Sequence, residues 1–544
     1  MYRPTSTQSS LFEPDVMFPG VLPQDDWSYI FRNKIYSLID EEKFKHLFKE
    51  KGGAPNKSIK LMLSILIFMA IEKLTWREAE FQFLRRIDWM IATSTALGDA
   101  FIDFTTLFKF YQRLEQDDTA YQLFQELTSL FIIECSVSTK KQRVDSFFML
   151  GWLKILSRYG LFKETIRAFL LALRKHKPGL YEEIKAELSR DYLEKEFDLT
   201  EKDKDKANRK ISEMAKDLYI LIAAFENHHQ VKHYEGFKTL KKVFEQQCSV
   251  TKEEASEPKI EIRKKPVGDK IISSPHNTDA EYTRKRKQTV VGHKAFVTET
   301  CDPDNEVQFI TDANLETAKH ADSKETLKIE ERLEDNGTKP EILYGDAGFV
   351  NGKTILESAE KGIDLAGPSS GRSQSIENFE QEDRPLDTAD FEVRINDNTK
   401  ELEVLSCPNK QKPLDQQRSD KGHILVHFES ETCSQCSMQD RCPVKIGVKV
   451  STLTISEEQY AGAIRHQQYM EDSDYRQECG IRAGAESLVN EVANGHGTRK
   501  SRHRTEKRSR LQLIFASIGC NVKRFIRYQV NCVQNQPEVV ESIA

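Results

Sequence analysis

One stretch of eight residues, Ile342 to Phe349, constrains the fold of this chain more than any other segment. Its first three residues are apolar and predict a short buried strand, and Gly345 then allows the backbone to turn. Asp346 follows at the exit of that strand. Functional groups in open α/β sheets lie beyond the carboxyl ends of the strands. The stretch therefore predicts an α/β core with a carboxylate at its working edge.

Two further acidic residues stand where they can join Asp346. Asp145 follows Arg143 and Val144, and we expect it at the end of the first core strand. Glu486 lies in an expected helix, one turn after Arg482. Hard divalent cations such as Mg²⁺, or Mn²⁺ in its place, prefer oxygen ligands, and two of them together support phosphodiester chemistry. Because the chain contains 86 acidic residues, composition alone does not select these three.

The totals describe a long, strongly charged chain. Its 544 residues predict several domains, and its net charge of −6 is unusual for a protein that binds nucleic acid. No secretion signal opens the chain, and the longest apolar run, 59–71, is too short to span a bilayer. Its ten cysteines do not form the dense pattern of a secreted disulfide framework. We therefore expect a cytoplasmic protein without a membrane partner.

The order of predicted strands and helices divides the chain into successive parts. Strand, hairpin, helix, strand, helix and strand follow one another after residue 259, which predicts a mixed sheet flanked by helices. The expected parts are a polar arm (1–26), a helical domain (27–135), the first core strand (136–160), a helical insertion and linker (161–258), the main core (259–366), an insertion with four cysteines (367–455), C-terminal helices that complete the core (456–532) and a tail (533–544).

The helical domain at 27–135 admits two interpretations. Apolar residues recur at helical spacing from Ile59 to Ala70, and Asp103 offers a capping side chain to a later helix. Short helices with tight connections fit a DNA reader of the helix-turn-helix kind. They also fit a helical bundle that only packs on the catalytic domain.

Two other clusters of residues are candidate binding sites. Four cysteines, one pair of them spaced as Cys-x-x-Cys, lie in a turn-rich segment and predict either a structural Zn²⁺ site or four free thiols: Cys407, Cys433, Cys436 and Cys442. The densest basic segment predicts contacts to DNA phosphates or a solvated helix end: Arg499, Lys500, Arg502, Arg504, Lys507, Arg508 and Arg510. Of His293 and His320, His320 is a weak secondary candidate for contact with DNA or a metal-bound water, since a loop histidine is more often simply solvated.

Three motifs in order resemble those of bacterial insertion-sequence transposases of the DDE type. They are Arg143-Val144-Asp145-Ser146, Tyr344-Gly345-Asp346-Ala347-Gly348-Phe349 and Arg482-Ala483-Gly484-Ala485-Glu486. The helical front and the ending Asn521-Val522-Lys523-Arg524 match too, and the clustered cysteines before the glutamate are similar to the insertion-sequence eleven-eighty-two group. The last helix departs from the usual pattern, because Cys479 and Ala493 stand where tyrosine and lysine belong; Tyr475 and Lys500 are possible substitutes.

The resemblance implies an RNase H-like core in which Asp145, Asp346 and Glu486 hold Mg²⁺ and catalyse DNA strand cleavage and transfer. It implies DNA partners, namely terminal inverted repeats and target DNA, with Arg482 and the basic segment on phosphates. It also implies a homo-oligomer on the element ends and a nucleoid-associated place in a bacterial cytoplasm. Two alternatives stay open: a non-catalytic DNA-binding protein derived from a transposase, and an RNase H-like nuclease without strand transfer.

Overall fold

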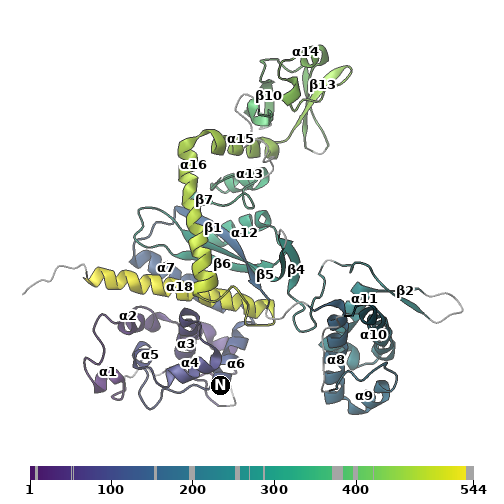
Figure 1. The fold of residues 1–544 in the computed structure, drawn as a ribbon. Helices are drawn as coiled ribbons and strands as arrows, with labels where there is room; N and C mark the ends of the chain where they lie inside the picture. Colours follow the sequence, from purple (N-terminus) through teal and green to yellow (C-terminus); the bar gives the residue numbers. More distant parts are fainter. Residues whose placement is uncertain are drawn as a thin grey trace, which may run out of the picture.

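The computed structural model describes residues 1–5, 10–50, 52, 54–151, 156–194, 203–251, 258–268, 270–285, 288–369, 384–395, 402–420 and 422–534. The chain is a mixed α/β protein with a mixed sheet, as the sequence predicts. N-terminal helices lie along one side of the long helix α18 (Glu506–Gln534), and the sheet lies along the other (Figure 1). The expected tail begins in α18, and its last ten residues lie outside the described part.

The N-terminal part is helical, as expected. Its elements are α1 (Pro14–Met17), α2 (Trp27–Lys34), α3 (Ile59–Glu72), α4 (Trp76–Phe83), α5 (Ile87–Ala92), α6 (Phe104–Leu114) and α7 (Thr119–Glu134), with 3-10 turns at Tyr36–Leu38 and Glu41–Leu47. Ser58 caps α3, because its side chain accepts a hydrogen bond from the Leu61 amide. The strong apolar character of α3 reflects its burial on nearly every side.

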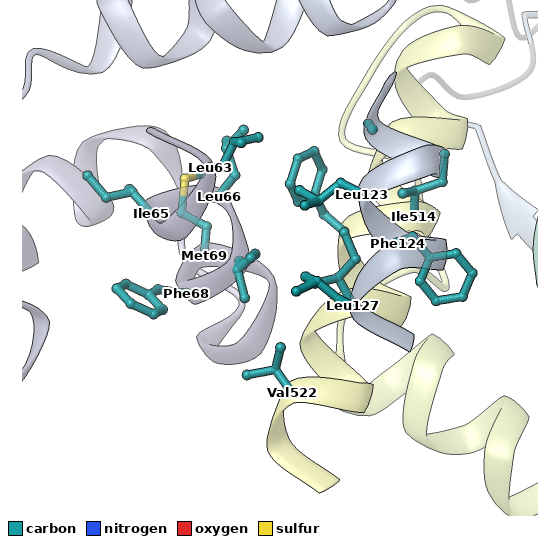
Figure 2. Packing of buried hydrophobic residues seen from close by; sticks show 14 of the residues in the cluster. Leu63, Ile65, Leu66, Phe68, Met69, Leu123, Phe124, Leu127, Ile514 and Val522 are labelled. Carbon is teal, nitrogen blue, oxygen red and sulfur yellow. The ribbon is translucent and has the colours of Figure 1, made fainter. Parts of the chain in front are cut away.

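The N-terminal helices share one hydrophobic core with the sheet. Figure 2 shows Leu66 and Met69 of α3 facing Leu123 and Leu127 of α7, with Ile514 of α18 beside them. The same buried cluster continues into strands of the sheet through Phe147 and Val297. The helical front is therefore packed firmly on the rest of the protein rather than tethered to it.

The central sheet has six strands in the order β4–β5–β1–β7–β8, with β6 also paired to β5. The strands are β1 (Lys141–Leu150), β4 (Glu281–Lys285), β5 (Gln288–Thr300), β6 (Ile310–Thr317), β7 (Ile342–Tyr344) and β8 (Asp364–Ala366). β5 is antiparallel to β1, β4 and β6, whereas β7 is parallel to both β1 and β8. The expected hairpin is thus present as β5 and β6.

Helices cover both faces of this sheet. On one face, α12 (Asp322–Asp335) contributes Ile329 and Leu333 to a cluster with Val144 and Phe296, and α13 (Gly352–Glu360) lies nearby. On the opposite face, Phe147 and Val297 pack in the cluster that includes Leu488 of α17 (Gly484–Asn490). Because neighbouring residues of a strand point to opposite faces, Asp145 points to the α17 face and Ser146 to the α12 face.

A helical unit between β1 and β4 has its own core. It consists of α8 (Arg158–His176), α9 (Pro178–Lys185), α10 (Lys204–Phe225) and α11 (Glu235–Gln247), with a 3-10 turn at Val231–His233 and the hairpin β2 (Cys248–Thr251) and β3 (Lys259–Ile262). Phe162, Phe169, Leu218 and Leu240 are buried among one another in it. Figure 1 shows this unit standing to one side of the sheet.

A small β unit lies at the far end of the molecule in Figure 1. It contains the hairpin β9 (Glu392–Ile395) and β10 (Leu402–Ser406), the sheet β11 (Asp415–Arg418), β12 (Ile424–Glu429) and β13 (Val450–Ile455), helix α14 (Ser430–Ser434) and 3-10 turns at Thr388–Asp390 and Gln439–Arg441. Val404, Val426, Phe428 and Leu453 form its core. Of the loop expected at 367–387, residues 370–383 lie outside the described part.

The chain returns from the β unit to the sheet through successive helices. These are α15 (Glu457–Glu471), α16 (Ser473–Cys479), a 3-10 turn (Gly480–Ala483), α17 and a π-helical turn (Glu491–Gly495), after which α18 begins. Backbone angles stay in the right-handed helical region at Gly480, Gly484 and Glu491, so the run is continuous across the changes of type. None of the described helices has both the length and the apolar character needed to span a membrane.

Asn521 of α18 ties the edge of the sheet to the helices. Its Oδ1 accepts a hydrogen bond of 2.8 Å from the Ile310 amide, and its Nδ2 donates to the Ile310 carbonyl at 2.8 Å and to Thr128 Oγ1 at 3.0 Å. Ile310 begins the edge strand β6, so no further strand among the described residues pairs with its outward backbone groups. The Asn521 amide satisfies both of them inside the core.

We expect Asn521→Ala to lower the stability of the protein by about 1–3 kcal/mol, because it leaves two buried backbone groups unpaired. Thermal unfolding of the full chain measures this. Asn494→Ala is the matched control, since the Asn494 side chain is exposed and bonds only to Asn490 Oδ1 among the described residues. Equal melting temperatures for the two variants would contradict the role given to Asn521.

Candidate active site

The pairing of β1 with β7 brings Asp145 and Asp346 together. Parallel partners run from Lys141 opposite Ile342 to Arg143 opposite Tyr344. β7 ends at Tyr344, two residues before Asp346, and the charge of Asp346 acts on the nearby carboxyl group of Asp145. The two aspartates therefore meet where β7 stops, although the chain separates them by the helical unit and most of the sheet.

Asp145 does not end its strand, contrary to our expectation. β1 continues to Leu150 because it stays paired with β5, where Asp145 lies opposite Val297. On its other side, however, β7 ends at Tyr344, so Asp145 faces the space beyond that shorter strand. Asp145 therefore faces the site because the neighbouring strand β7 ends there, and not because β1 ends there.

The turn after β7 fixes the Asp346 carboxylate. Its Oδ1 accepts a hydrogen bond of 2.7 Å from the Gly348 amide, and its carbonyl accepts from the amides of Phe349 and Val350. A Cβ added to Gly348 would lie 2.9 Å from both Asp346 Oδ1 and Asp322 Oδ2. Only glycine fits there without displacing a carboxylate, which explains the Gly348 of the motif.

Helix α17 carries the third predicted acid, Glu486, across β1. Arg143 of β1 donates a hydrogen bond of 2.8 Å to the Ile481 carbonyl, and a Cβ on Gly484 would lie 1.9 Å from its guanidinium. This close contact seats the helix directly on the strand. Arg482 lies within electrostatic reach of Asp145. Glu486 is exposed one turn later and makes no hydrogen bond or ion pair within the described residues.

The pKa of Asp145 is raised to about 6, mainly because the carboxyl group is buried. The charges of Asp346 and Asp322 contribute to the rise, whereas the Ser146 amide and Arg482 oppose it. The Ser146 amide hydrogen bond to Asp145 Oδ1 measures 2.7 Å. A bound cation would relieve the repulsion between these carboxylates, although the oxygens of Asp145, Asp346 and Asp322 do not all lie within 4.8 Å of one another in the described chain.

Asp322, which the sequence analysis did not select, belongs to this carboxylate group. It is the first residue of α12, and one of its oxygens accepts a 2.8 Å hydrogen bond from Ser146 Oγ. The Lys294 ammonium lies 2.7 Å from the same carboxylate. The sequence could have identified Asp322, because it is an aspartate that begins a helix directly after a strand of the sheet. This position places it at the same edge of the sheet as Asp346.

A buried ionic network holds the helices in place around the site. Glu299 of β5 accepts hydrogen bonds from Arg143 Nη2 at 2.6 Å and from Arg524 Nη1 at 2.7 Å. Arg524 of α18 also donates to Glu491 at 2.6 Å. The pKa of Arg524 is raised by these anionic neighbours despite its burial. The network joins β1, β5, the π-helical turn and α18 within two turns of Glu486.

Tyr475 and Lys500, the substitutes considered for the missing tyrosine and lysine, each have contacts of their own in the structure. The hydroxyl of Tyr475 accepts hydrogen bonds from Arg465 at 2.8 Å and from the Gly367 amide at 3.1 Å, so it serves a different contact. Cys479 is buried beneath Tyr344, and Ala493 is buried in the main core. Lys500 is exposed and pairs through its backbone with Leu150 at the end of β1.

The basic segment divides into anchored and exposed side chains. Arg508 forms a two-pronged ion pair with Glu115, Arg510 pairs with Asp118, and Arg502 donates to the carbonyls of Lys73 and Leu74. These three tie α18 and its approach to the N-terminal helices. Arg502 is nevertheless exposed, as are the remaining basic side chains Arg499, Lys500, Arg504 and Lys507.

The four predicted cysteines meet in the small β unit. All of them line one cavity of about 30 Å³, and none forms a disulfide. The Gln411 amide lies 3.4 Å from Cys407 Sγ, and Asn409 Nδ2 lies 3.6 Å from Cys436 Sγ. Burial raises the thiol pKa of Cys433 and of Cys442, and neighbouring cysteines raise it further. Their sulfurs do not form one of the groups whose ligand atoms all lie within 4.8 Å of one another in the described chain.

The two candidate histidines lie at or near the sheet. His293 of β5 is buried, and burial lowers its pKa to about 4, which makes it a neutral core residue. His320 lies between Glu316 and Glu325, with its Nε2 3.0 Å from a Glu325 oxygen. Neither ring contacts Asp145 or Asp346 in the described chain.

Two family models match parts of this chain, and both describe transposases. Residues 406–526 match a transposase DDE domain, a range that includes the four cysteines, Arg482, Glu486 and most of α18. Residues 20–113 match a transposase domain (DUF772), which covers most of the N-terminal helices. Asp145 and Asp346 lie outside both ranges. No curated protein and no solved structure matches the chain. The matches support a transposase of the insertion-sequence kind.

The raised pKa of Asp145 gives stability a definite pH dependence. The folded protein holds this proton more tightly than the unfolded chain, so the associated stability is present below about pH 4 and is lost as pH rises through about 6.

In EDTA, we expect Asp145→Asn to stabilise the protein by about 2 kcal/mol at pH 7.5 and to change little at pH 4. Urea unfolding at both pH values measures the difference, with Asp304→Asn in an exposed turn as control. A loss of stability at both pH values would contradict the burial argument.

Proposed function

We propose that this chain is a DNA transposase that cuts and joins DNA strands at the ends of an insertion sequence. The observation that carries the proposal is the adjacency of Asp145 and Asp346 at the end of β7, in a chain matched by two transposase families. The sheet order β6–β5–β1–β7–β8, with helices on both faces, supports an RNase H-like core. The clustered cysteines before Glu486 favour membership of the insertion-sequence eleven-eighty-two group.

The donor set suits Mg²⁺ or Mn²⁺. Asp145 and Asp346 would supply oxygen ligands near the end of β7, and the repulsion between their carboxylates favours a cation between them. Glu486 is exposed on α17, which packs against β1, and it has no hydrogen bond or ion pair within the described residues. Bound metal ions would supply the Lewis acidity that activates an attacking oxygen and stabilises the leaving oxygen of a phosphodiester.

The chain's own residues would orient the DNA around this centre. Arg482 lies close to Asp145, where its guanidinium can hold a non-bridging phosphate oxygen. Arg499, Lys500, Arg504 and Lys507 extend an exposed basic strip from the end of β1, because Leu150 pairs with Lys500. The anchored Arg502, Arg508 and Arg510 would act mainly by holding the N-terminal helices in place.

The N-terminal helices are our proposed readers of the terminal inverted repeats. Their rigid attachment through α18 fixes the distance between a bound repeat and the carboxylates. Target DNA would enter at the same catalytic edge, and two copies of the chain would hold the two element ends. Local placement of the basic strip makes DNA binding compatible with the net charge of −6.

Substitution of each proposed ligand tests the catalytic assignment. Asp145→Asn, Asp346→Asn and Glu486→Gln should each lower Mg²⁺-dependent cleavage of DNA carrying the inverted repeats by at least about a thousandfold, because transition-state charge loses its stabilisation. DNA binding should persist in a mobility-shift assay. Asp474→Asn, an exposed acid earlier in the same helical run, is the control.

The same assay separates the alternatives. A transposase joins the cleaved end to a second duplex, whereas a nuclease of the same fold releases it without joining. A non-catalytic DNA-binding protein shifts the repeat but does not nick it in Mg²⁺ or Mn²⁺. Cleavage that survives all three substitutions would refute the proposed site.

We further propose that Cys407, Cys433, Cys436 and Cys442 hold a structural Zn²⁺. Their shared cavity and the N–H groups directed at Cys407 and Cys436 support this assignment. The sulfurs would have to draw together on binding, which would cross-link the β10–β11 connection to α14 and the turn before β13.

Purified protein should contain about one zinc per chain, and Cys436→Ser should lose it, because three thiolates retain the ion less well than four. Elemental analysis after gel filtration measures the zinc. Cys532→Ser, near the end of α18, should keep the wild-type content. Metal-free wild-type protein with unchanged melting of the small β unit would argue for free thiols.

A further inference from the structure

Beside the proposed metal ligands lies a fourth carboxylate that is already neutralised. Asp322 and Lys294 form an ion pair at 2.7 Å, and only 20% and 12% of their side chains, respectively, are exposed. Lys294 also lies 3.4 Å from the His320 carbonyl. The ammonium therefore comes from β5 and the carboxylate from the first turn of α12, so two separate elements fix the pair in position.

This ion pair is connected to both proposed aspartate ligands. Ser146 donates its hydroxyl to Asp322 at 2.8 Å and its backbone amide to Asp145 Oδ1 at 2.7 Å. On the other side, Gly348 keeps Asp322 Oδ2 and Asp346 Oδ1 close, because each lies 2.9 Å from the point where its Cβ would be. Asp322 is thus linked to Asp145 through Ser146 and is packed against the turn that presents Asp346.

The charge of this group differs greatly with and without Lys294. Asp145 and Asp346 carry two negative charges close to Asp322, and the proposed ligand Glu486 would bring a third from α17; an unpaired Asp322 would add a fourth. A more negative site binds divalent cations more tightly and leaves them less able to polarise an oxygen of the substrate. Lys294 cancels that fourth charge while Asp322 still orients Ser146.

We propose that Lys294 and Asp322 are positioning residues of the metal site, in which Asp322 orders Asp145 through Ser146 and Lys294 limits the site to three negative charges. The inference rests on the proposed function, since it concerns the metal that the three acids would hold. It assigns to Lys294 a restraint on cation affinity that an ordinary structural ion pair would not exert.

The test uses Mn²⁺ alone as the probe and the full-length protein. Mn²⁺ affinity is measured by electron paramagnetic resonance of the free ion and by calorimetry, at constant ionic strength. Asp322→Asn should weaken Mn²⁺ binding roughly tenfold, because it removes a negative charge and leaves the Lys294 charge near the site. Lys294→Met should strengthen binding roughly tenfold, because it frees the Asp322 charge.

The double variant Lys294→Met/Asp322→Asn distinguishes an effect of net charge on Mn²⁺ affinity from an effect of altered structure. With both charges gone, its Mn²⁺ affinity should return to within about threefold of the wild type, since the net charge of the group is restored. Lys339→Met, which breaks the 2.9 Å pair with Glu334 at the other end of α12, should leave affinity unchanged. Thermal unfolding of each variant verifies that it is folded.

Opposite changes in affinity for the two single variants, with recovery in the double, support the proposal. Equal affinities throughout, or losses in both single variants without recovery, would overturn it. If Asp145→Asn and Asp346→Asn also keep wild-type Mn²⁺ affinity, the metal site itself is wrong and the proposed function fails with it. The two failures are therefore distinguishable in one series of measurements.

Discussion

The parallel pairing of β1 with β7 is the contact on which the site depends. These strands come from regions of the chain about two hundred residues apart, and they share only three paired positions. A slip of one residue would reverse the faces to which the side chains of β7 point and would displace the turn that presents Asp346. The register is fixed by what lies on each face, since Leu343 packs under α12 and Tyr344 packs near Cys479. Hydrophobic burial therefore determines where the carboxylates meet.

Helix α18 extends this constraint to the rest of the molecule. Its apolar residues fill the core between the N-terminal helices and the sheet, and Arg524 enters the same interior. A buried guanidinium is costly unless it is fully paired, and here Glu299 and Glu491 provide that pairing. Because Glu299 also accepts from Arg143, the network fixes the direction of the helices as well as their packing. These ion pairs therefore fix the orientation of the helices around Glu486, which apolar packing alone would not do.

The sequence predicts the parts of this protein that depend on local pattern. The strand before Asp346, the β5–β6 hairpin and the helical front each carry their own periodicity, and the structure contains all three. The length of β1 was misjudged because its continuation is set by β5, a partner far along the chain. The sequence did not identify Asp322 for the same reason, because Asp322 approaches the other carboxylates only when α12 is packed at the end of β7. The anchored arginines of the basic segment likewise reveal their internal partners only after α18 is packed.

The helical unit leaves the sheet and returns to it at neighbouring points. Gly151 donates a hydrogen bond of 2.8 Å to the Val291 carbonyl, so the chain on either side of more than a hundred intervening residues is as close as in a short hairpin. Loop-closure entropy grows only with the logarithm of loop length, and the unit has its own core. The large size of the inserted helical unit therefore adds little to the free-energy cost of forming the sheet. This junction is a place where a lineage can acquire, exchange or shed an entire domain while the strand that bears Asp145 stays in register.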